Sequence, residues 1–303
     1  MTTLSTTQKP DGFDVFWSGI DADLARFPIA AETKLNPRRS NEFTTSYDVK
    51  LTSIGPYRIF AYLSIPHGDG PFPGLVYFPR YGSVNQPTTW EDKQRFVTLT
   101  IMHRGQRLAD QPFAASYPGL LTLGIDDSET YIYRGIAADC IRGLEYLLER
   151  PEVDRTRIGA IGDDLALIAA ARRPGSLSAL QITPLMFHKA NELRQTTDAY
   201  PIEELNDEIR SAPDREAAIV RTLSFFDPLH HVPAVTANTC LIAGDDGVPG
   251  GPEWLGDLKS AFGGESLFYQ LTHEGGTDHD AQDAWLASEL GSDAMPRLWE
   301  AAL

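Results

Sequence analysis

Residues 157–171 read RIGAIGDDLALIAAA. A short apolar run ends at Gly162 and is followed by two aspartates and a second apolar stretch. This pattern predicts a buried strand that turns sharply into a helix. Many α/β enzymes mount a nucleophilic serine at such a turn, in the pattern Gly-x-Ser-x-Gly. Here the central residue is Asp164, and no serine of the chain lies in that pattern.

Strand-like and helix-like segments alternate on both sides of this turn. Runs rich in β-branched and aromatic residues, bounded by Gly or Pro, predict strands at 46–53, 57–66, 74–82, 96–105, 178–183, 238–246 and 265–273. Apolar residues at helical spacing predict helices at 13–27, 131–151 and 254–262 and at the C-terminal end. Strands that alternate with helices predict an α/β fold with a mostly parallel central sheet and helices on both faces.

The domain organisation follows from length and composition. With 303 residues, 42% of them apolar, the chain suits one α/β domain spanning 1–303. We expect residues 1–12 to be a loose leader and residues 185–223 to be a helical insertion before the late strands. Residues 106–130 form a long connection with several Pro and Gly, and a loop of that length is usually functional or interfacial.

Composition also narrows the partners. The chain has 26 basic and 42 acidic residues, a net charge of −16, which argues against nucleic-acid binding. No window approaches the roughly 18 consecutive apolar residues of a membrane span, and no secretory signal is visible, so we expect a cytoplasmic protein without a membrane partner. Cys140 and Cys240 are the only cysteines, which predicts neither a disulfide framework nor a thiolate metal site. We expect no metal and no cofactor.

Three chemically capable side chains follow predicted strands. Asp164 follows the strand that ends at Gly162, Asp245 or Asp246 follows CLIAG, and His273 follows LFYQLT. The carboxyl ends of parallel strands are where such sheets carry their chemistry. The order nucleophile, acid, histidine is that of α/β-hydrolases, and a histidine acts as a general base when a carboxylate holds its other ring nitrogen.

Each of these side chains also has a structural interpretation. A single histidine at a strand end is more often structural than catalytic. The pair Asp245 and Asp246 suits a turn before Gly247. Asp163 and Asp164 suit the start of a helix, where aspartate caps the backbone.

Longer motifs appear in a fixed order along the chain. They are FDVFW near residue 13, HRGQ at 103–106, the stretch 117–159, AGDDGVP at 243–249 and THEGG at 272–276. Together they resemble the acetyl xylan esterases and cephalosporin-C deacetylases, a branch of the α/β-hydrolase fold, from about residue 13 to residue 279. The resemblance implies an α/β-hydrolase fold with a small-molecule substrate. It also implies a homo-oligomer, possibly a hexamer, with the segment 106–130 at the subunit interface.

The resemblance assigns roles to individual residues. His273 corresponds to the catalytic histidine and Asp245 to its acid. The backbone amides of Tyr81 and Leu165 correspond to the two donors of the oxyanion hole. The nucleophile position holds Asp164 instead of serine. We therefore expect an Asp-His-Asp triad in which one Asp164 oxygen reaches His273 while Asp245 holds the other ring nitrogen.

An aspartate at this position changes the chemistry. Its carboxylate is ionised at neutral pH and can displace a leaving group from a saturated carbon, after which His273 would activate water to hydrolyse the alkyl ester. Attack on an acetyl ester gives a mixed anhydride, which is uphill of the substrate. We therefore expect a hydrolase with an altered nucleophile, acting on a small ester or alkyl substrate. The alternatives are a catalytically silent homologue that acts as a binding protein, and a lyase or isomerase with Asp164 as general base.

Two consequences can be examined in a structure and by mutation. An enzyme should keep an open pocket bounded by Tyr81, Trp90, Leu165, Met186 and His273. If only the nucleophile has changed, Asp164→Ser should create hydrolysis of activated acetyl esters.

Overall fold

The computed structural model describes residues 5–85 and 87–295, and in this part of the chain nine strands form one sheet. The strands are β1 (Glu32–Leu35), β2 (Thr44–Thr52), β3 (Arg58–Pro66), β4 (Phe72–Tyr77), β5 (Val97–Met102), β6 (Val153–Gly162), β7 (Ala179–Ile182), β8 (Asn238–Ala243) and β9 (Ser266–Gln270). Their order is β1-β2-β3-β5-β4-β6-β7-β8-β9. Strands β1, β2, β3 and β5 pair antiparallel, and every pair from β5 to β9 is parallel.

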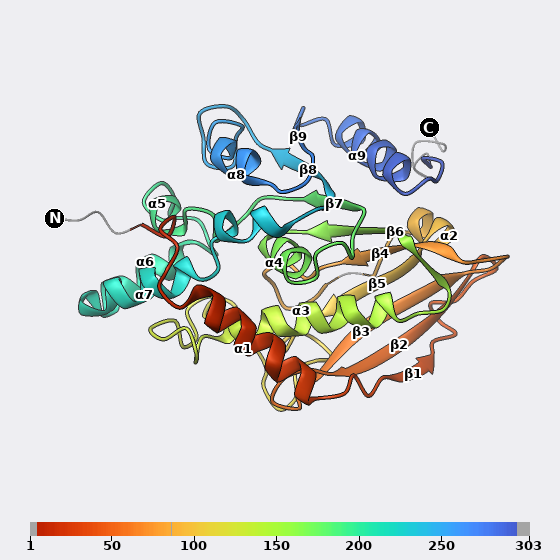
Figure 1. The fold of residues 1–303 in the computed structure, drawn as a ribbon, viewed down its shortest axis with the longest axis horizontal. Coiled ribbons are helices and arrows are strands. Elements are labelled where there is room, and N and C mark those ends of the chain that lie inside the picture. Colours follow the sequence, from red (N-terminus) through yellow and green to blue (C-terminus); the bar gives the residue numbers. More distant parts are fainter. Residues whose placement is uncertain (1–4, 86, 296–303) are drawn as a thin grey trace.

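Helices cover both faces of this sheet (Figure 1). They are α1 (Phe13–Arg26), α2 (Trp90–Arg95), α3 (Ile132–Leu148), α4 (Asp164–Arg172), α5 (Ala190–Leu193), α6 (Glu203–Ser211), α7 (Glu216–Ser224), α8 (Gly256–Ala261) and α9 (Gly275–Glu289), with 3-10 turns η1 (Pro213–Arg215), η2 (Pro228–His230) and η3 (Val232–Ala234). Helices α1, α3 and α4 share one face, where Trp17, Tyr131 and Tyr133 are buried in the main core. On the other face, Leu286 of α9 and Leu290, which follows the helix, pack with Leu75 of β4. The predicted mostly parallel α/β fold is confirmed.

The insertion and the leader are both held by the body of the protein. Helices α5, α6 and α7 fall within residues 185–223 and lie together at one end of the molecule (Figure 1). In the predicted leader, Thr6 is fully buried and its hydroxyl donates to Asp227 Oδ2 at 2.9 Å. The leader is therefore anchored at Thr6, while residues 1–4 of it lie outside the described residues.

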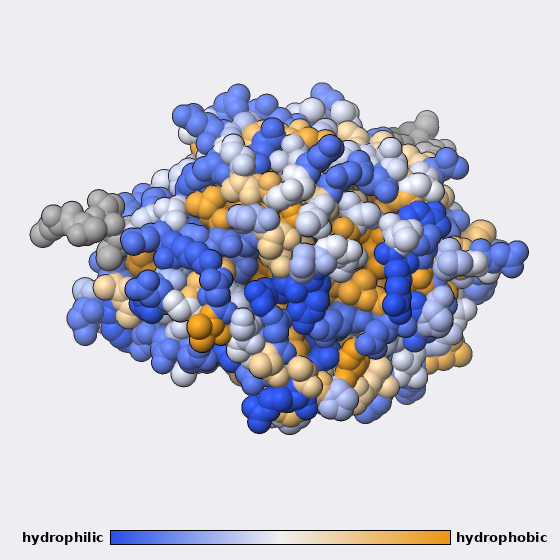
Figure 2. Space-filling model, viewed as in Figure 1, coloured by the Kyte–Doolittle hydropathy of each residue, from blue (hydrophilic) through white to orange (hydrophobic). Residues whose placement is uncertain are grey.

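The visible surface is largely hydrophilic (Figure 2). On the face drawn in Figure 2, hydrophilic residues separate the hydrophobic ones into small patches. Within residues 5–85 and 87–295, no helix combines the length and the apolar character that crossing a bilayer requires.

Candidate functional site

Five parallel strands bring their carboxyl ends to one edge of the sheet. Tyr81 follows β4, Asp164 follows β6, Met186 follows β7, Asp245 follows β8 and His273 follows β9. This edge is where α/β sheets bind ligands. The strand-end placement expected from the sequence therefore holds, and the remaining question is which side chains meet there.

The turn from β6 into α4 is tight, and a hydrogen bond within the turn caps the helix. A Cβ on Gly162 would lie 2.7 Å from that of Ala166 and 2.8 Å from that of Phe78, so the close approach requires glycine. Asp163 is the N-cap of α4, and its Oδ1 accepts a hydrogen bond from the Leu165 amide at 3.1 Å. The structural interpretation of this aspartate is thus correct. It also means that the Leu165 N–H, expected to serve an oxyanion, already has a carboxylate partner.

Asp164 is held in the interior. Its side chain is 0% exposed, with Oδ2 accepting from the Met186 amide at 2.7 Å and Oδ1 from the Phe187 amide at 3.1 Å. Burial and the neighbouring charge of Asp163 raise its pKa well above the usual range, although the two amides favour the charged form. Burial likewise raises the pKa of Asp163 to about 6, against the lowering effects of the Leu165 amide and the Arg80 charge.

Asp164 also lacks the backbone geometry of a nucleophile turn. A serine in that position sits on a sharp, strained strand-to-helix connection. Asp164 is instead the first residue of α4, and it is not among the described residues with positive φ. Its backbone and its side chain both match an interior structural residue.

Asp245 and His273 do meet. His273 Nε2 lies 2.8 Å from Asp245 Oδ1, and the two side chains are 61% and 68% exposed. The hydrogen bond and the negative charge of Asp245 raise the pKa of His273. The backbone of His273 has a positive φ of 62°, which is uncommon for a residue with a side chain and directs the ring toward Asp245 after β9.

The expected Asp-His-Asp triad is not assembled. Among the described residues, no hydrogen bond joins Asp164 to His273. The reason is burial: both oxygens of Asp164 face the backbone that follows β7, whereas the imidazole of His273 lies at the surface. The geometry expected for residue 164 is therefore wrong, and that expected for Asp245 with His273 is observed.

Tyr81 is hydrogen-bonded to Glu204, a residue that the sequence analysis did not identify. Its hydroxyl donates to Glu204 Oε1, while Glu204 Oε2 accepts from the amides of Gly119 at 2.8 Å and Leu121 at 3.1 Å. Glu204 is 4% exposed and belongs to α6 of the insertion. One buried carboxylate thus joins the insertion, the loop after β4 and the long connection 106–130.

The HRGQ motif supports the same loop. Gln106 Nε2 donates to the carbonyls of Gly82 at 2.8 Å and Arg80 at 3.2 Å, on either side of Tyr81. Arg104 forms a buried ion pair with Asp139 of α3, with Nη2 2.8 Å from Oδ1. The motif positions the Tyr81 loop and contributes no reactive group of its own.

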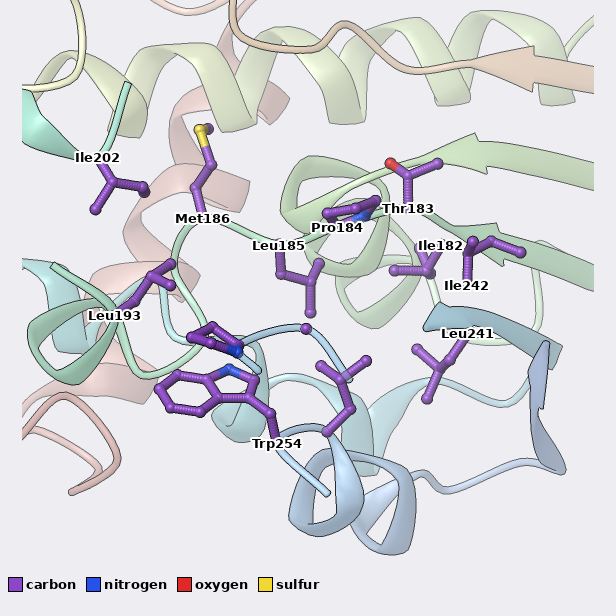
Figure 3. Close-up of a pocket in the computed structure, with 13 residues that line it drawn as sticks. Ile182, Thr183, Pro184, Leu185, Met186, Leu193, Ile202, Leu241, Ile242 and Trp254 are labelled. Atoms are coloured by element: carbon purple, nitrogen blue, oxygen red, sulfur yellow. The ribbon is translucent and has the colours of Figure 1, made fainter. Parts of the chain in front are cut away.

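The side chains expected to bound a pocket at residue 164 have other neighbours in the structure. Trp90 begins α2 and packs edge-on against Phe43, with ring centroids 5.7 Å apart. Met186 instead lines a cavity of about 260 Å³ at the ends of β7 and β8, together with Leu193, Ile202 and Trp254 (Figure 3). Neither Tyr81, Trp90, Leu165 nor His273 lines this cavity.

One feature of the site escaped the sequence interpretation, whereas the helix cap at Asp163 was among its structural alternatives. Glu204 lies in a strongly polar helix, EELNDEIRS, where nothing distinguishes the buried glutamate from its exposed neighbours. The role of Asp163 had a signal, since aspartate is favoured before a helix. Within the described ranges, no group of three or more His, Cys, Asp or Glu side chains is arranged to hold a metal ion.

The buried aspartate pair makes stability depend on pH. The pKa values of both aspartates are raised above the unfolded value of about 3.9, so the folded state binds more protons than the unfolded state. The resulting contribution to the free energy of unfolding is present below about pH 4 and is lost as the pH rises through about 6. Asp163→Asn keeps a capping oxygen but removes the charge. Between pH 4 and pH 7, we expect the free energy of unfolding of wild type to fall by on the order of 2 kcal/mol relative to that of this variant. Urea unfolding measures the difference.

Wild type has to be compared with Asp163→Asn because His103 and His231 also make the stability depend on pH. Burial lowers the pKa of His103 to about 4 and that of His231 to about 3, so both histidines destabilise the folded state at low pH. This effect is the same in wild type and in Asp163→Asn, and it cancels in the difference between their free energies of unfolding. Parallel stability curves for wild type and Asp163→Asn would contradict the prediction.

Comparison with known proteins places this chain in a family. The family model described as acetyl xylan esterase (AXE1) matches residues 2–249. The chain belongs to the acetyl xylan esterase family. The acetyl esterase Axe7A of Xylanibacter ruminicola is 24% identical over 211 residues, covering 64% of this chain and 48% of that protein. The chain therefore spans about half the length of this curated relative.

Solved members of the acetyl xylan esterase family share the fold. The acetyl xylan esterase from Paenibacillus sp. R4 superimposes with a TM-score of 0.80 at 24% identity, covering 93% of this chain and 95% of that one. Acetyl xylan esterase 1 from Thermoanaerobacterium sp. JW/SL YS485 superimposes with a TM-score of 0.78 at 18% identity, covering 94% of this chain and 96% of that one. At these identities the likeness establishes the fold, and activity has to be argued from the site.

Proposed function

We propose that this chain keeps the acetyl xylan esterase scaffold but does not perform acyl transfer through residue 164, and that it has a binding or scaffold role. The observation that carries this proposal is the environment of Asp164. The side chain has no exposed surface, and both of its oxygens accept hydrogen bonds from the amides of Met186 and Phe187.

The chemistry of this environment opposes nucleophilic attack. A nucleophile must reach the substrate, whereas both oxygens of Asp164 are buried and each already accepts a hydrogen bond from the backbone. Its raised pKa favours the neutral acid, which is a poor nucleophile. The oxyanion donor at Leu165 is engaged by Asp163. A lyase or isomerase that uses Asp164 as general base meets the same obstacle of access.

A second candidate is a hydrolase that uses Asp164 as nucleophile. The hydrogen bond of 2.8 Å between Asp245 and His273 favours it, because a base with its orienting acid is already paired. This candidate requires the segment at Met186 to move, so that Asp164 is released toward a small ester or alkyl substrate.

The two candidates differ in turnover. We expect wild type to hydrolyse p-nitrophenyl acetate, a haloalkane and an epoxide no faster than Asp164→Asn or His273→Ala. The second candidate instead requires wild-type turnover that both variants abolish. It also requires an alkyl ester to accumulate on Asp164 in His273→Ala, detected as a mass increase on the peptide containing residue 164, since the ester would then lack its water-activating base.

We also propose a homo-oligomer, such as a hexamer, with residues 106–130 at the interface. Leu120, Leu121 and Ile125 of this segment are buried in their own chain, while Leu123 is 44% exposed. Light scattering at micromolar concentration should return a multiple of 33.4 kDa, and Leu123→Ser should shift the mass downward. A wild-type mass of one chain would contradict the proposal.

A further inference from the structure

A cavity of about 260 Å³ lies beside the candidate site and shares Met186 with it. Its walls come from Ile182 and the segment after β7, from Leu193 of α5, from Ile202 before α6, and from the end of β8 with Trp254 (Figure 3). Asp164 does not line it. An inference about this cavity therefore goes beyond the proposed function and does not depend on the chemistry of residue 164.

The walls are apolar. Of the described residues that line the cavity, none is charged, and the one hydroxyl, on Thr183, donates to the Gly162 carbonyl at 3.1 Å. Water in a cavity needs two or more polar partners, and apolar cavities of about 150 Å³ stay dry and bind benzene. This cavity is larger and similarly lined, so it suits an uncharged ring or short alkyl chain better than water.

The indole of Trp254, which borders the cavity, is fixed by contacts with Lys189. The Trp254 carbonyl accepts from Lys189 Nζ at 2.9 Å, and that ammonium lies 5.1 Å from the indole ring and 2.9 Å from Asp257 Oδ2. A wall fixed in this way loses little conformational freedom when a ligand binds. The position at the carboxyl ends of β7 and β8 is also where parallel sheets bind their ligands.

We propose that this cavity binds a small uncharged apolar molecule, an aromatic ring or a short alkyl chain. Ile182 and Leu241, which are 1% exposed, form its floor, and Met186 and Ile202 border it on the side of the insertion. A carboxylate on the same ring would meet no charged partner among the described residues that line the cavity, so it should bind more weakly.

Methyl labelling of methionine tests the proposal in the intact protein. The chain has four methionines, of which Met186 lines the cavity and Met102 is buried in β5. Toluene should shift the Met186 methyl resonance saturably and leave that of Met102 unchanged, while benzoate should shift neither. No saturable shift of Met186 up to the solubility of toluene, or an equal response to benzoate, would overturn the proposal.

A matched pair of variants locates the binding. Leu193→Phe fills the cavity, while Leu148→Phe makes the same change at a half-buried position of α3 that does not line it. We expect Leu193→Phe to weaken toluene binding by about tenfold or more, that is by at least about 1.4 kcal/mol, and Leu148→Phe to leave it unchanged. Equal affinity in Leu193→Phe and wild type would contradict this location. If Leu193→Phe fails to fold, the wild-type Met186 titration decides alone.

Discussion

Glu204→Ala should lower the free energy of unfolding by about 3 kcal/mol or more. The carboxylate accepts three hydrogen bonds, from the Tyr81 hydroxyl and from the amides of Gly119 and Leu121. It is 4% exposed, its bond to the Leu121 amide is buried and those to Tyr81 and Gly119 are part-buried, so its removal leaves donors that water replaces poorly. Each unsatisfied buried group costs about 1–3 kcal/mol. Urea unfolding at neutral pH measures the loss.

Glu204→Gln provides the matched control. It keeps the size of the side chain and one carbonyl oxygen, but it places an NH2 group against donors that need an acceptor. We therefore expect a destabilisation between those of wild type and Glu204→Ala. Hydrogen exchange at Gly119 and Leu121 should accelerate in the same order. If both variants unfold within about 0.5 kcal/mol of wild type, the carboxylate does not join the insertion to the 106–130 segment in solution.

Asp164→Ser alone should leave the protein without measurable acetyl esterase activity. The sequence suggested the opposite, because the other parts of the family's site were expected to be in place. In the structure the Leu165 amide donates to Asp163 Oδ1, so a serine at 164 would lack that oxyanion donor. Adding Asp163→Ala frees the amide. The double variant should still hydrolyse p-nitrophenyl acetate no faster than Asp164→Ser, because residue 164 has no exposed surface and no hydrogen bond joins it to His273.

Two controls accompany the double variant. Asp163→Ala alone frees the donor but supplies no serine, and it should be inert while losing about 1 kcal/mol of stability with the helix cap. Adding His273→Ala to the double variant should therefore change nothing. A double variant about a hundredfold or more faster than Asp164→Ser, with a gain that His273→Ala removes, would mean that the dyad of Asp245 and His273 does serve position 164.

Several parts of the fold could be predicted from local sequence. Helix α3 follows from apolar spacing that ends before Pro151, and β4, β6 and β8 follow from short apolar runs near Gly or Pro. Strand β1 was missed, because its four residues are all exposed and form no apolar pattern. It is ordered by antiparallel pairing with β2, which local propensity does not report.

The sequence by itself determined the α/β fold, the strand ends that carry Asp164, Asp245 and His273, and the absence of the expected serine. Only the tertiary structure decided what Asp164 does. Its partners are amides 22 and 23 residues away in the chain, and those of Glu204 lie 83 to 123 residues away. Periodicity and capping patterns describe neighbours within a turn or a strand. Which carboxylate is buried, and which amides it meets, depends on how distant segments pack, and that is set by the assembled core.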